Sequence, residues 1–296
     1  MHPVLMFIAS GWGFWCGLAV LAVAIPAGLR GRSGATLSLT VTATVLGILL
    51  VALSSTPVSG WIIWPLFAAA LAMVVTLRFE TPWRYGAAAL TAALAVSAAV
   101  LELPYWLDPE PLVCRGKLWI LADSISSGIG FEEETVWSEL LEREHPGRIA
   151  NRAVPGSKVG SSLRILEERF DFSPGDVLLI ELGGNDLLGG VSGDEFARKL
   201  DELLSAVAAR EVPAVMFELP LPPFRGAYLR AQRFLAEKYG VRLIPRRRFA
   251  AVLRGSESVV DGVHLSNYGH EKMAEVVRGV VRFDEPHRAA PEQKGD

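Results

Sequence analysis

Residues 118–130 read LWILADSISSGIG, and this stretch decides how the second half of the chain folds. It opens with an apolar run containing bulky side chains, which is typical of a strand buried on both faces. The polar pair Asp123-Ser124 follows directly, and a short run of small residues with two glycines comes next. Burying an aspartate and a serine is costly, so their place at the tip of this strand indicates a functional site.

Apolar strands and amphipathic helices alternate from here to residue 281. Strands are predicted at 117–123, 148–153, 176–184, 213–220 and 241–246, and helices at 133–144, 161–170, 194–210, 227–240 and 266–281. Near-continuous apolar strands separated by helices imply a parallel sheet covered on both faces. We therefore expect an α/β fold over residues 117–283, a flavodoxin-like three-layer sandwich with a five-stranded parallel sheet.

Polar residues recur at the ends of the predicted strands. Asp123-Ser124 follows the first, NRAVPGS with Gly156 follows the second, and GGNDLL with Asn185 follows the third. DGVHLSNYGH, with Asp261 and His264, precedes the last helix. Ligands of parallel sheets bind beyond the carboxyl ends of the strands, so we expect these residues to meet at one edge.

These four blocks, in this order, resemble the SGNH (GDSL-type) hydrolase superfamily, which is named for a Ser, a Gly, an Asn and a His. Here Ser124, Gly156, Asn185 and His264 match them, and IELGGND is most similar to the bacterial thioesterase, lysophospholipase and arylesterase branch. The resemblance covers roughly residues 117–281 and implies a serine ester hydrolase. Ala122 departs from the family, which usually has Gly before Asp-Ser. One added methyl group leads us to expect tolerance rather than loss of activity.

The chemistry supports the same catalytic residues independently. A serine hydroxyl is a poor nucleophile until a base takes its proton, and His264 is the best placed of the five histidines to do so. Asp261 lies three residues earlier, close enough to accept a hydrogen bond from Nδ1 and fix the tautomer of the ring. We predict Ser124 as the nucleophile, His264 as the base and Asp261 as its partner.

The resemblance also implies an oxyanion hole. Its donors would be the backbone N–H groups of Ser124 and Gly156 and the side-chain amide of Asn185. Asp123 is expected to be structural and to bond nearby backbone amides. Neither a Cys-x-x-Cys pair nor a His and carboxylate cluster with metal spacing occurs, so we expect no metal and no cofactor.

The first hundred residues differ sharply from the rest in composition. They hold four of the 29 basic and one of the 32 acidic residues, and they contain four apolar stretches. We predict an all-α membrane domain over residues 1–101 with transmembrane helices at about 4–29, 36–54, 58–77 and 85–101, the last of them Ala-rich and slightly short. The first run lacks the basic opening of a signal peptide, so a retained helix is expected. The two cysteines leave one disulfide, Cys16–Cys114, as a minor alternative.

Charge in the short loops predicts how this domain is oriented. Arg30 and Arg32 lie between the first two helices, Arg78 and Arg84 lie between the last two, and the middle loop is uncharged. Because positive loops stay in the cytoplasm, both chain ends should face outward. We expect a multi-pass protein of the cytoplasmic (inner) membrane with its catalytic domain on the periplasmic or extracellular side. Residues 102–116 form a linker and 284–296 a disordered tail.

The substrate is less well determined by sequence. LPLPPFRG (219–226) lies at the reactive edge, and it offers Leu221 and Phe224 as candidate acyl contacts. Trp119 and Trp137 fit the core, so no stacking platform for sugars is evident. We expect a membrane-anchored esterase or lipase-like hydrolase that cleaves small carboxylic esters or thioesters, or acyl lipids of the membrane, through an acyl-serine. No nucleic acid partner is expected. The alternatives are an O-acetylesterase or acyltransferase acting on cell-envelope polysaccharide, and a non-catalytic ligand-binding protein.

Overall fold

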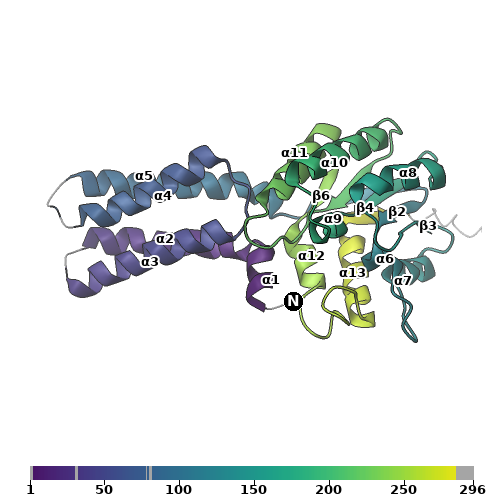
Figure 1. Ribbon diagram of the computed structural model, residues 1–296, viewed down its shortest axis with the longest axis horizontal. Coiled ribbons are helices and arrows are strands. Elements are labelled where there is room, and N and C mark those ends of the chain that lie inside the picture. The colour runs from purple at the N-terminus through teal and green to yellow at the C-terminus, as the bar shows by residue number, and fades with distance from the viewer. Residues whose placement is uncertain (1–2, 31–32, 78, 80–81, 285–296) are drawn as a thin grey trace, which may run out of the picture.

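The structure is a computed structural model that describes residues 3–30, 33–77, 79 and 82–284, without the side chain of Arg30. Arg32, Arg78 and all of the predicted tail except residue 284 lie outside the described residues. Figure 1 shows two parts, a stalk of long helices and an α/β domain at one end of it. The predicted division into a helical part and an α/β part is visible directly.

The stalk consists of two antiparallel helical hairpins, α2 with α3 and α4 with α5 (Figure 1). Its helices and the short helix before them are α1 (Pro3–Ala9), α2 (Trp12–Arg30), α3 (Gly34–Leu53), α4 (Gly60–Thr76) and α5 (Trp83–Glu102). Small residues allow the backbones of α2 and α3 to approach closely. A Cβ on Gly17 would lie 2.8 Å from the main-chain oxygen of Gly47, which explains why glycine stands at that crossing.

Among the residues that the structure describes, three helices, rather than the four expected, are long and apolar enough to cross a membrane: α2, α3 and α5. The run predicted at 58–77 forms α4, whose 17 residues rise about 25 Å, short of a hydrocarbon core of about 30 Å. The short, Ala-rich run at 85–101 extends at both ends to form α5 and is one of the three. Ser59 is the N-cap, so α4 begins two residues later than predicted, and it ends at Thr76, one residue earlier.

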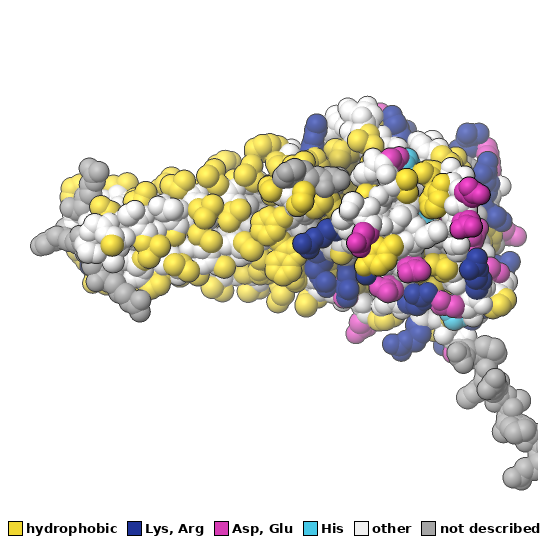
Figure 2. Space-filling model, turned by 90° about the horizontal axis from the view of Figure 1, so that it is seen from below, with side chains coloured by type: hydrophobic (Ala, Val, Ile, Leu, Met, Phe, Trp, Pro, Cys, Tyr) yellow, Lys and Arg dark blue, Asp and Glu magenta, His cyan; other side chains and the backbone are white. Residues whose placement is uncertain are grey.

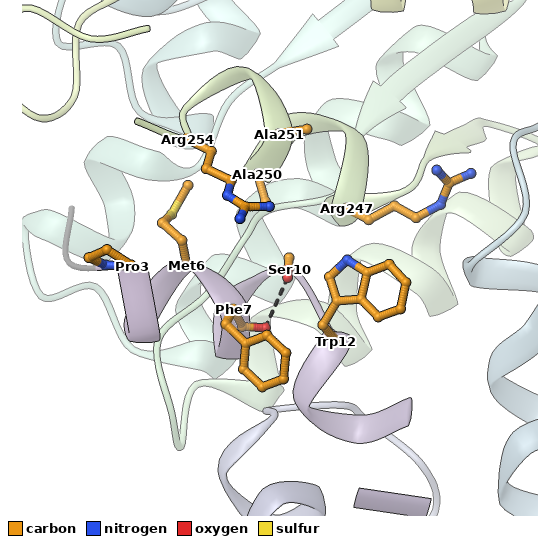
Figure 3. Close-up of a pocket in the computed structure, with 9 residues that line it drawn as sticks. All are labelled: Pro3, Met6, Phe7, Ser10, Trp12, Arg247, Ala250, Ala251 and Arg254. Carbon is orange, nitrogen blue, oxygen red and sulfur yellow. Dashed lines mark hydrogen bonds between the residues drawn. The ribbon is translucent and has the colours of Figure 1, made fainter. Parts of the chain in front are cut away.

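The first apolar run also differs from prediction, because it forms two helices instead of one. The chain turns at Gly11, whose φ of 91° is a left-handed conformation that favours glycine. A Cβ there would meet the guanidinium group of Arg246 at 2.9 Å. The seven residues of α1 therefore leave the stalk and pack on α12 (Arg246–Val252) of the α/β domain. Figure 3 shows the small cavity of about 90 Å³ left between these helices, with Met6, Phe7 and Trp12 on one side and Arg254 on the other.

Hydrophobic side chains cover the stalk, whereas charged side chains lie on the α/β domain (Figure 2). Exposed tryptophans mark both ends of the helices. Trp12, Trp61 and Trp64 lie near the α/β domain, and Trp83 lies at the opposite end. Tryptophan favours the membrane–water interface, so this distribution is the one expected of membrane-embedded helices.

The α/β domain confirms the predicted five-stranded parallel sheet. Its strand order is β3-β2-β4-β5-β6. The strands are β2 (Leu118–Ala122), β3 (Ile149–Asn151), β4 (Val177–Glu181), β5 (Ala214–Phe217) and β6 (Arg242–Ile244). Every residue of the central strands β2 and β4 is buried, which explains their unbroken apolar sequence.

Helices cover both faces of this sheet and make the three layers (Figure 1). One layer contains α8 (Val159–Arg169), α10 (Gly193–Ala208) and α11 (Gly226–Tyr239). The other contains α7 (Trp137–Glu144), α12 and α13 (Asn267–Val280). Trp119 and Trp137 are buried in the core as predicted. The expected flavodoxin-like sandwich is therefore the observed architecture.

The predicted linker contains structure that the sequence pattern did not indicate. Leu103–Tyr105 form a 3-10 helix, η1, and Leu112–Cys114 form β1, which pairs in parallel with β7 (Val281–Phe283). Arg148 ties the segment down by donating to the main-chain oxygens of Cys114 and Gly116. Cys16 and Cys114 are both free, and burial raises the pKa of the Cys114 thiol to about 11.

Four buried charged side chains join the stalk to the α/β domain. Glu102, at the end of α5, accepts two hydrogen bonds from Arg233 of α11, at 2.6 and 2.9 Å. Arg233 also donates to Glu218, which follows β5, over 2.6 Å. Glu218 accepts in turn from the backbone N–H of Arg246. We call Glu102, Glu218, Arg233 and Arg246 the junction network; each exposes at most 7% of its surface.

Arg246 extends this network to the other helix ends. Its guanidinium group donates to the main-chain oxygen of Ser54 over 3.1 Å and to Thr56 Oγ1 over 2.6 Å, both between α3 and α4. It also lies beneath Gly11 at the turn between α1 and α2. It lies 3.7 Å from Glu102 of α5 as well. One arginine thus contacts three separate segments at the inner end of the stalk, the end next to the α/β domain, and this fixes how the α/β domain sits on the stalk.

Breaking the junction network should destabilise the whole chain. Glu102→Gln leaves two buried guanidinium groups facing a single carboxylate, a loss that typically costs about 3–5 kcal/mol. We expect thermal unfolding of the full chain in detergent micelles to begin several degrees lower. The control is Asp201→Asn, which removes a surface partner of Lys238; it should leave the midpoint unchanged, since exposed ion pairs contribute little. Equal midpoints for the parent and Glu102→Gln would contradict this role.

Candidate functional site

The predicted nucleophile lies at the carboxyl edge of the sheet. Ser124 is the first residue of α6 (Ser124–Ser127), which begins directly after β2. Asp123 is the N-cap, and its Oδ1 accepts a hydrogen bond from the backbone N–H of Ile125 over 3.0 Å. Ala122 ends the extended strand, where its methyl group is buried without a left-handed backbone. Asp123 therefore has the structural role expected of it, and the departure at Ala122 is accommodated.

His264 and Asp261 complete a hydrogen-bonded chain from Ser124. The distance between His264 Nε2 and Ser124 Oγ is 3.1 Å, and that between His264 Nδ1 and Asp261 Oδ2 is 2.7 Å. The other oxygen of Asp261 accepts from the backbone N–H groups of Val263 and His264. Hydrogen bonds from the His264 ring and from these amides hold the pKa of Asp261 well below its usual range. Residues 140 positions apart are thus within reach for proton transfer.

The three predicted oxyanion residues follow three neighbouring strands, β2, β3 and β4. Gly156 has a φ of 74°, and a Cβ there would meet nothing within 4 Å, so its backbone is open to approach. Within the described part of the chain, the N–H groups of Ser124 and Gly156 have no hydrogen-bond acceptor. The Asn185 amide donates to Asp123 Oδ2 over 2.9 Å and to the main-chain oxygen of Ser157 over 3.2 Å. Both hydrogens of that amide are engaged, so Asn185 must exchange one bond to reach an oxyanion.

The two predicted substrate contacts lie in very different environments. Leu221 is packed in the core and exposes 1% of its surface. Phe224 exposes 82% and has a φ of 65°, a conformation that is strained for a bulky residue. Of the two, Phe224 is the one that a substrate at the surface could contact.

Sequence reasoning did not single out other apolar side chains exposed on loops of the same edge. Leu188, in α9 (Gly184–Leu188) after β4, exposes 75% of its surface, and Ile129, after α6, exposes 43%. Val263 is the neighbour of His264 and exposes 40%. The signal was present in the sequence, because each of these residues stands within five positions of a predicted site residue.

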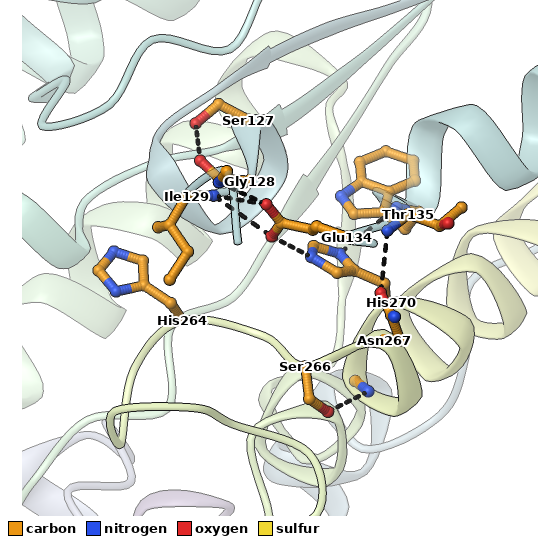
Figure 4. Close-up of polar contacts among 12 residues, drawn as sticks. Ser127, Gly128, Ile129, Glu134, Thr135, His264, Ser266, Asn267 and His270 are labelled. Carbon is orange, nitrogen blue, oxygen red and sulfur yellow. Dashed lines mark hydrogen bonds and ion pairs between the residues drawn. The ribbon is translucent and has the colours of Figure 1, made fainter. Parts of the chain in front are cut away.

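A buried histidine braces the loop that follows the nucleophile (Figure 4). His270 of α13 accepts from the backbone N–H of Trp137 at Nδ1 and faces Glu134 Oε1 with Nε2 at 3.2 Å. Glu134 also accepts from the backbone N–H groups of Ile129 and Gly130. Burial lowers the pKa of His270, which favours the neutral ring that these contacts require. Figure 4 shows Ile129 pointing toward His264, so this network shapes one wall of the site.

Comparison with known proteins agrees with the geometry. A family model described as "GDSL-like Lipase/Acylhydrolase family" matches residues 123–272, half of the chain, and the chain belongs to this family. The match begins after the stalk helices and includes every residue of the predicted catalytic and oxyanion sets. The predicted relationship to the SGNH (GDSL-type) superfamily is therefore confirmed.

Individual relatives are distant. An arylesterase from Vibrio mimicus is 28% identical over 171 residues, which are 54% of this chain and 86% of the relative. A thioesterase 1/protease 1/lysophospholipase L1 from Escherichia coli (strain K12) is 26% identical over 154 residues, 50% of this chain and 74% of the relative. A solved structure titled "Crystal Structure of TesA" has a TM-score of 0.47 and 24% identity, and it covers 54% of this chain and 95% of that one.

Substitutions at the predicted catalytic residues should lower activity far more than a substitution at a neighbouring serine. Ser124→Ala should lower kcat toward an aryl acetate by about 10⁴-fold or more, and Asp261→Asn by about 10²- to 10⁴-fold. Ser127→Ala, in the same helical turn, is the matched control and should retain activity within a few-fold. Initial rates for full-chain variants in detergent provide the measurement. A Ser124→Ala enzyme as active as the parent would refute the proposed nucleophile.

Proposed function

We propose that this protein is a membrane-anchored serine hydrolase that cleaves carboxylic esters or thioesters through an acyl-serine intermediate. The observation that carries the proposal is the continuous contact from Ser124 through His264 to Asp261. Membership of the GDSL-like lipase/acylhydrolase family supports it, as do relatives named arylesterase and thioesterase 1/protease 1/lysophospholipase L1.

In the first half-reaction, His264 Nε2 takes the proton of Ser124 as Oγ attacks the carbonyl carbon. Asp261 stabilises the imidazolium that forms. The open N–H groups of Ser124 and Gly156 would donate to the developing oxyanion, where one such donor typically contributes about 3 kcal/mol. His264 then returns the proton to the departing alcohol or thiol, which leaves the acyl group on Ser124.

The second half-reaction releases the acid. Water enters the site vacated by the leaving group and gives a proton to His264 as it attacks the acyl-serine. The tetrahedral intermediate collapses, Ser124 Oγ regains its proton, and the carboxylic acid departs. Each step of this scheme uses only these side chains and water.

One hydrogen bond and two exposed tryptophans support substrates drawn from a membrane. Ser55, between α3 and α4, donates to the main-chain oxygen of Pro222 over 2.7 Å, which ties the loop carrying Phe224 to the inner end of the stalk. Trp61 and Trp64 lie at the start of α4, where the membrane–water interface is expected. Phe224 would thus extend from a fixed point near the lipid headgroups, suited to contact an acyl chain.

The arrangement of the stalk supports the predicted orientation. The last turns of α2 and α4 and the first turns of α3 and α5 lie at the end of the stalk away from the sheet (Figure 1). All four arginines of the first hundred residues belong to those segments or to their immediate flanks. Positive loops stay in the cytoplasm, so the α/β domain would face the periplasm or the exterior of the cytoplasmic membrane.

Removing the exposed phenyl ring should affect long-chain substrates only. Phe224→Ser should lower kcat/KM for a lysophospholipid in lipid nanodiscs by about 10-fold or more, since burying an aromatic ring contributes about 1.5–3 kcal/mol. Hydrolysis of an aryl acetate should be unchanged. Phe234→Ser is the control, because Phe234 of α11 is similarly exposed but lies outside the loop.

A panel of aryl acetate, long-chain acyl esters and O-acetylated glycan, offered to the full chain in nanodiscs, tests the substrate class. Preference for the long-chain esters is expected. Preference for acetylated glycan would instead favour a polysaccharide O-acetylesterase or acyltransferase. Failure to cleave any of the three, while Ser124 remains unreactive, would contradict the hydrolase proposal itself.

A further inference from the structure

Two carboxyl groups are buried side by side beneath the nucleophile. Asp123 exposes 2% of its surface and Glu181 exposes 1%. They lie on neighbouring strands, because Glu181 ends β4 opposite Ala122, the residue before Asp123. The family pattern accounts for Asp123 but gives Glu181 no role, and a buried acid at the centre of the sheet is costly enough to need one.

Asp123 connects the nucleophile to the oxyanion edge. One oxygen accepts from the backbone N–H of Ile125 at 3.0 Å and holds the turn that carries Ser124. The other accepts from the side-chain amide of Asn185 at 2.9 Å and orients that amide. The position of this single carboxylate therefore sets the geometry of two functional groups.

Glu181 also contacts the turn that carries Ser124. Its Oε2 accepts a hydrogen bond from Ser126 Oγ over 3.0 Å, and Ser126 belongs to the turn of the nucleophile. Its carboxyl group also lies next to that of Asp123, because Glu181 pairs with Ala122 on the adjacent strand. A hydrogen bond between two carboxyl groups needs one proton, because two carboxylates offer only acceptors.

No described lysine or arginine is positioned to balance a second negative charge on the Asp123–Glu181 pair. Among the residues that the structure describes, neither Asp123 nor Glu181 forms an ion pair with a lysine or arginine. The other charged groups that face Asp123 are His264 and Asp186. Burial raises the pKa of both acids, and the charge of Asp123 adds to the effect on Glu181, whose pKa lies well above its usual range.

We infer that Glu181 is a positioning residue that keeps a proton and donates it to Asp123, so that Asp123 stays an acceptor for Asn185 and for the turn of Ser124. The inference rests on the proposed function for its effect on catalysis. Glu181 does not touch the substrate, and it acts through Asp123. The pair also keeps one negative charge facing His264, where the imidazolium forms during each turnover.

Two substitutions separate this role from simple packing. Glu181→Gln keeps a donor for Asp123 and an acceptor for Ser126, so kcat should remain within a few-fold of the parent. Glu181→Met fills a similar volume without a hydrogen-bonding group. It should lower kcat by about 100-fold with KM changed only a few-fold, as when an oxyanion donor is lost. Equal loss in both variants, or none in either, would overturn the inference.

The pH dependence provides a readout that packing would not change. In the parent, kcat should fall at alkaline pH as the shared proton is lost, whereas Glu181→Gln keeps its amide hydrogens and should lack that fall. Because the amide variant is close in shape to the parent, this comparison stands even where Glu181→Met does not fold. An alkaline profile identical in the two proteins would count against the shared proton.

Stability measurements test the proton without any catalysis. An acid whose pKa is raised in the folded state binds more protons folded than unfolded, so its contribution falls as pH rises above about 4.3. The thermal unfolding midpoint of Glu181→Gln in detergent should therefore rise relative to that of the parent between about pH 4 and pH 7. The exposed Glu168→Gln is the control and should follow the parent. If the midpoints of the parent and of Glu181→Gln change with pH in the same way, Glu181 does not hold the inferred proton. If the midpoints diverge as expected but the parent has no hydrolase activity, only the proposed function is refuted.

Discussion

The carboxyl ends of five parallel strands meet at one edge of the sheet, and this constraint arranges every functional part of the protein. The ends of β2, β3 and β4 bring Ser124, Gly156 and Asn185 together, and the segment before α13 adds Asp261 and His264. The ends of β5 and β6 carry Glu218 and Arg246, which dock on the stalk. One half of the edge carries the proposed catalytic residues, while the other half docks on the stalk.

This division explains why charged residues join two otherwise apolar surfaces. A hydrophobic contact could bury the same area but would tolerate sliding, whereas bidentate bonds from Arg233 to Glu102 permit one geometry. Buried ion pairs contribute little net stability, and their value here is a fixed orientation. Together with the bond from Ser55 to Pro222, the junction network fixes the position of the loop of Phe224 relative to the stalk.

Sequence patterns predicted the α/β half well because its signals are local. Apolar runs mark the strands, and the polar residues just after them mark the edge, so Ser124, His264 and Asp261 could be named in advance. The features that the sequence did not predict depend on contacts between residues far apart in the chain. The turn at Gly11 is explained only by Arg246, 235 positions later, and β1 is a strand only because β7 lies beside it. Glu181 reads as part of an apolar strand, and its importance emerges once Asp123 and Ser126 lie next to it. Counting apolar residues also overestimated the length of α4, because the length of a helix depends on where the turn before it ends.

Covalent labelling tests the central claim most directly, namely that one hydroxyl is activated by one imidazole. The full chain in detergent is treated with a fluorophosphonate, digested, and analysed by peptide mass spectrometry. The account predicts a single modified serine, Ser124, with labelling that slows by orders of magnitude in His264→Ala while Ser127→Ala reacts like the parent. Modification of a different serine, or equal labelling rates with and without the imidazole of His264, would contradict it.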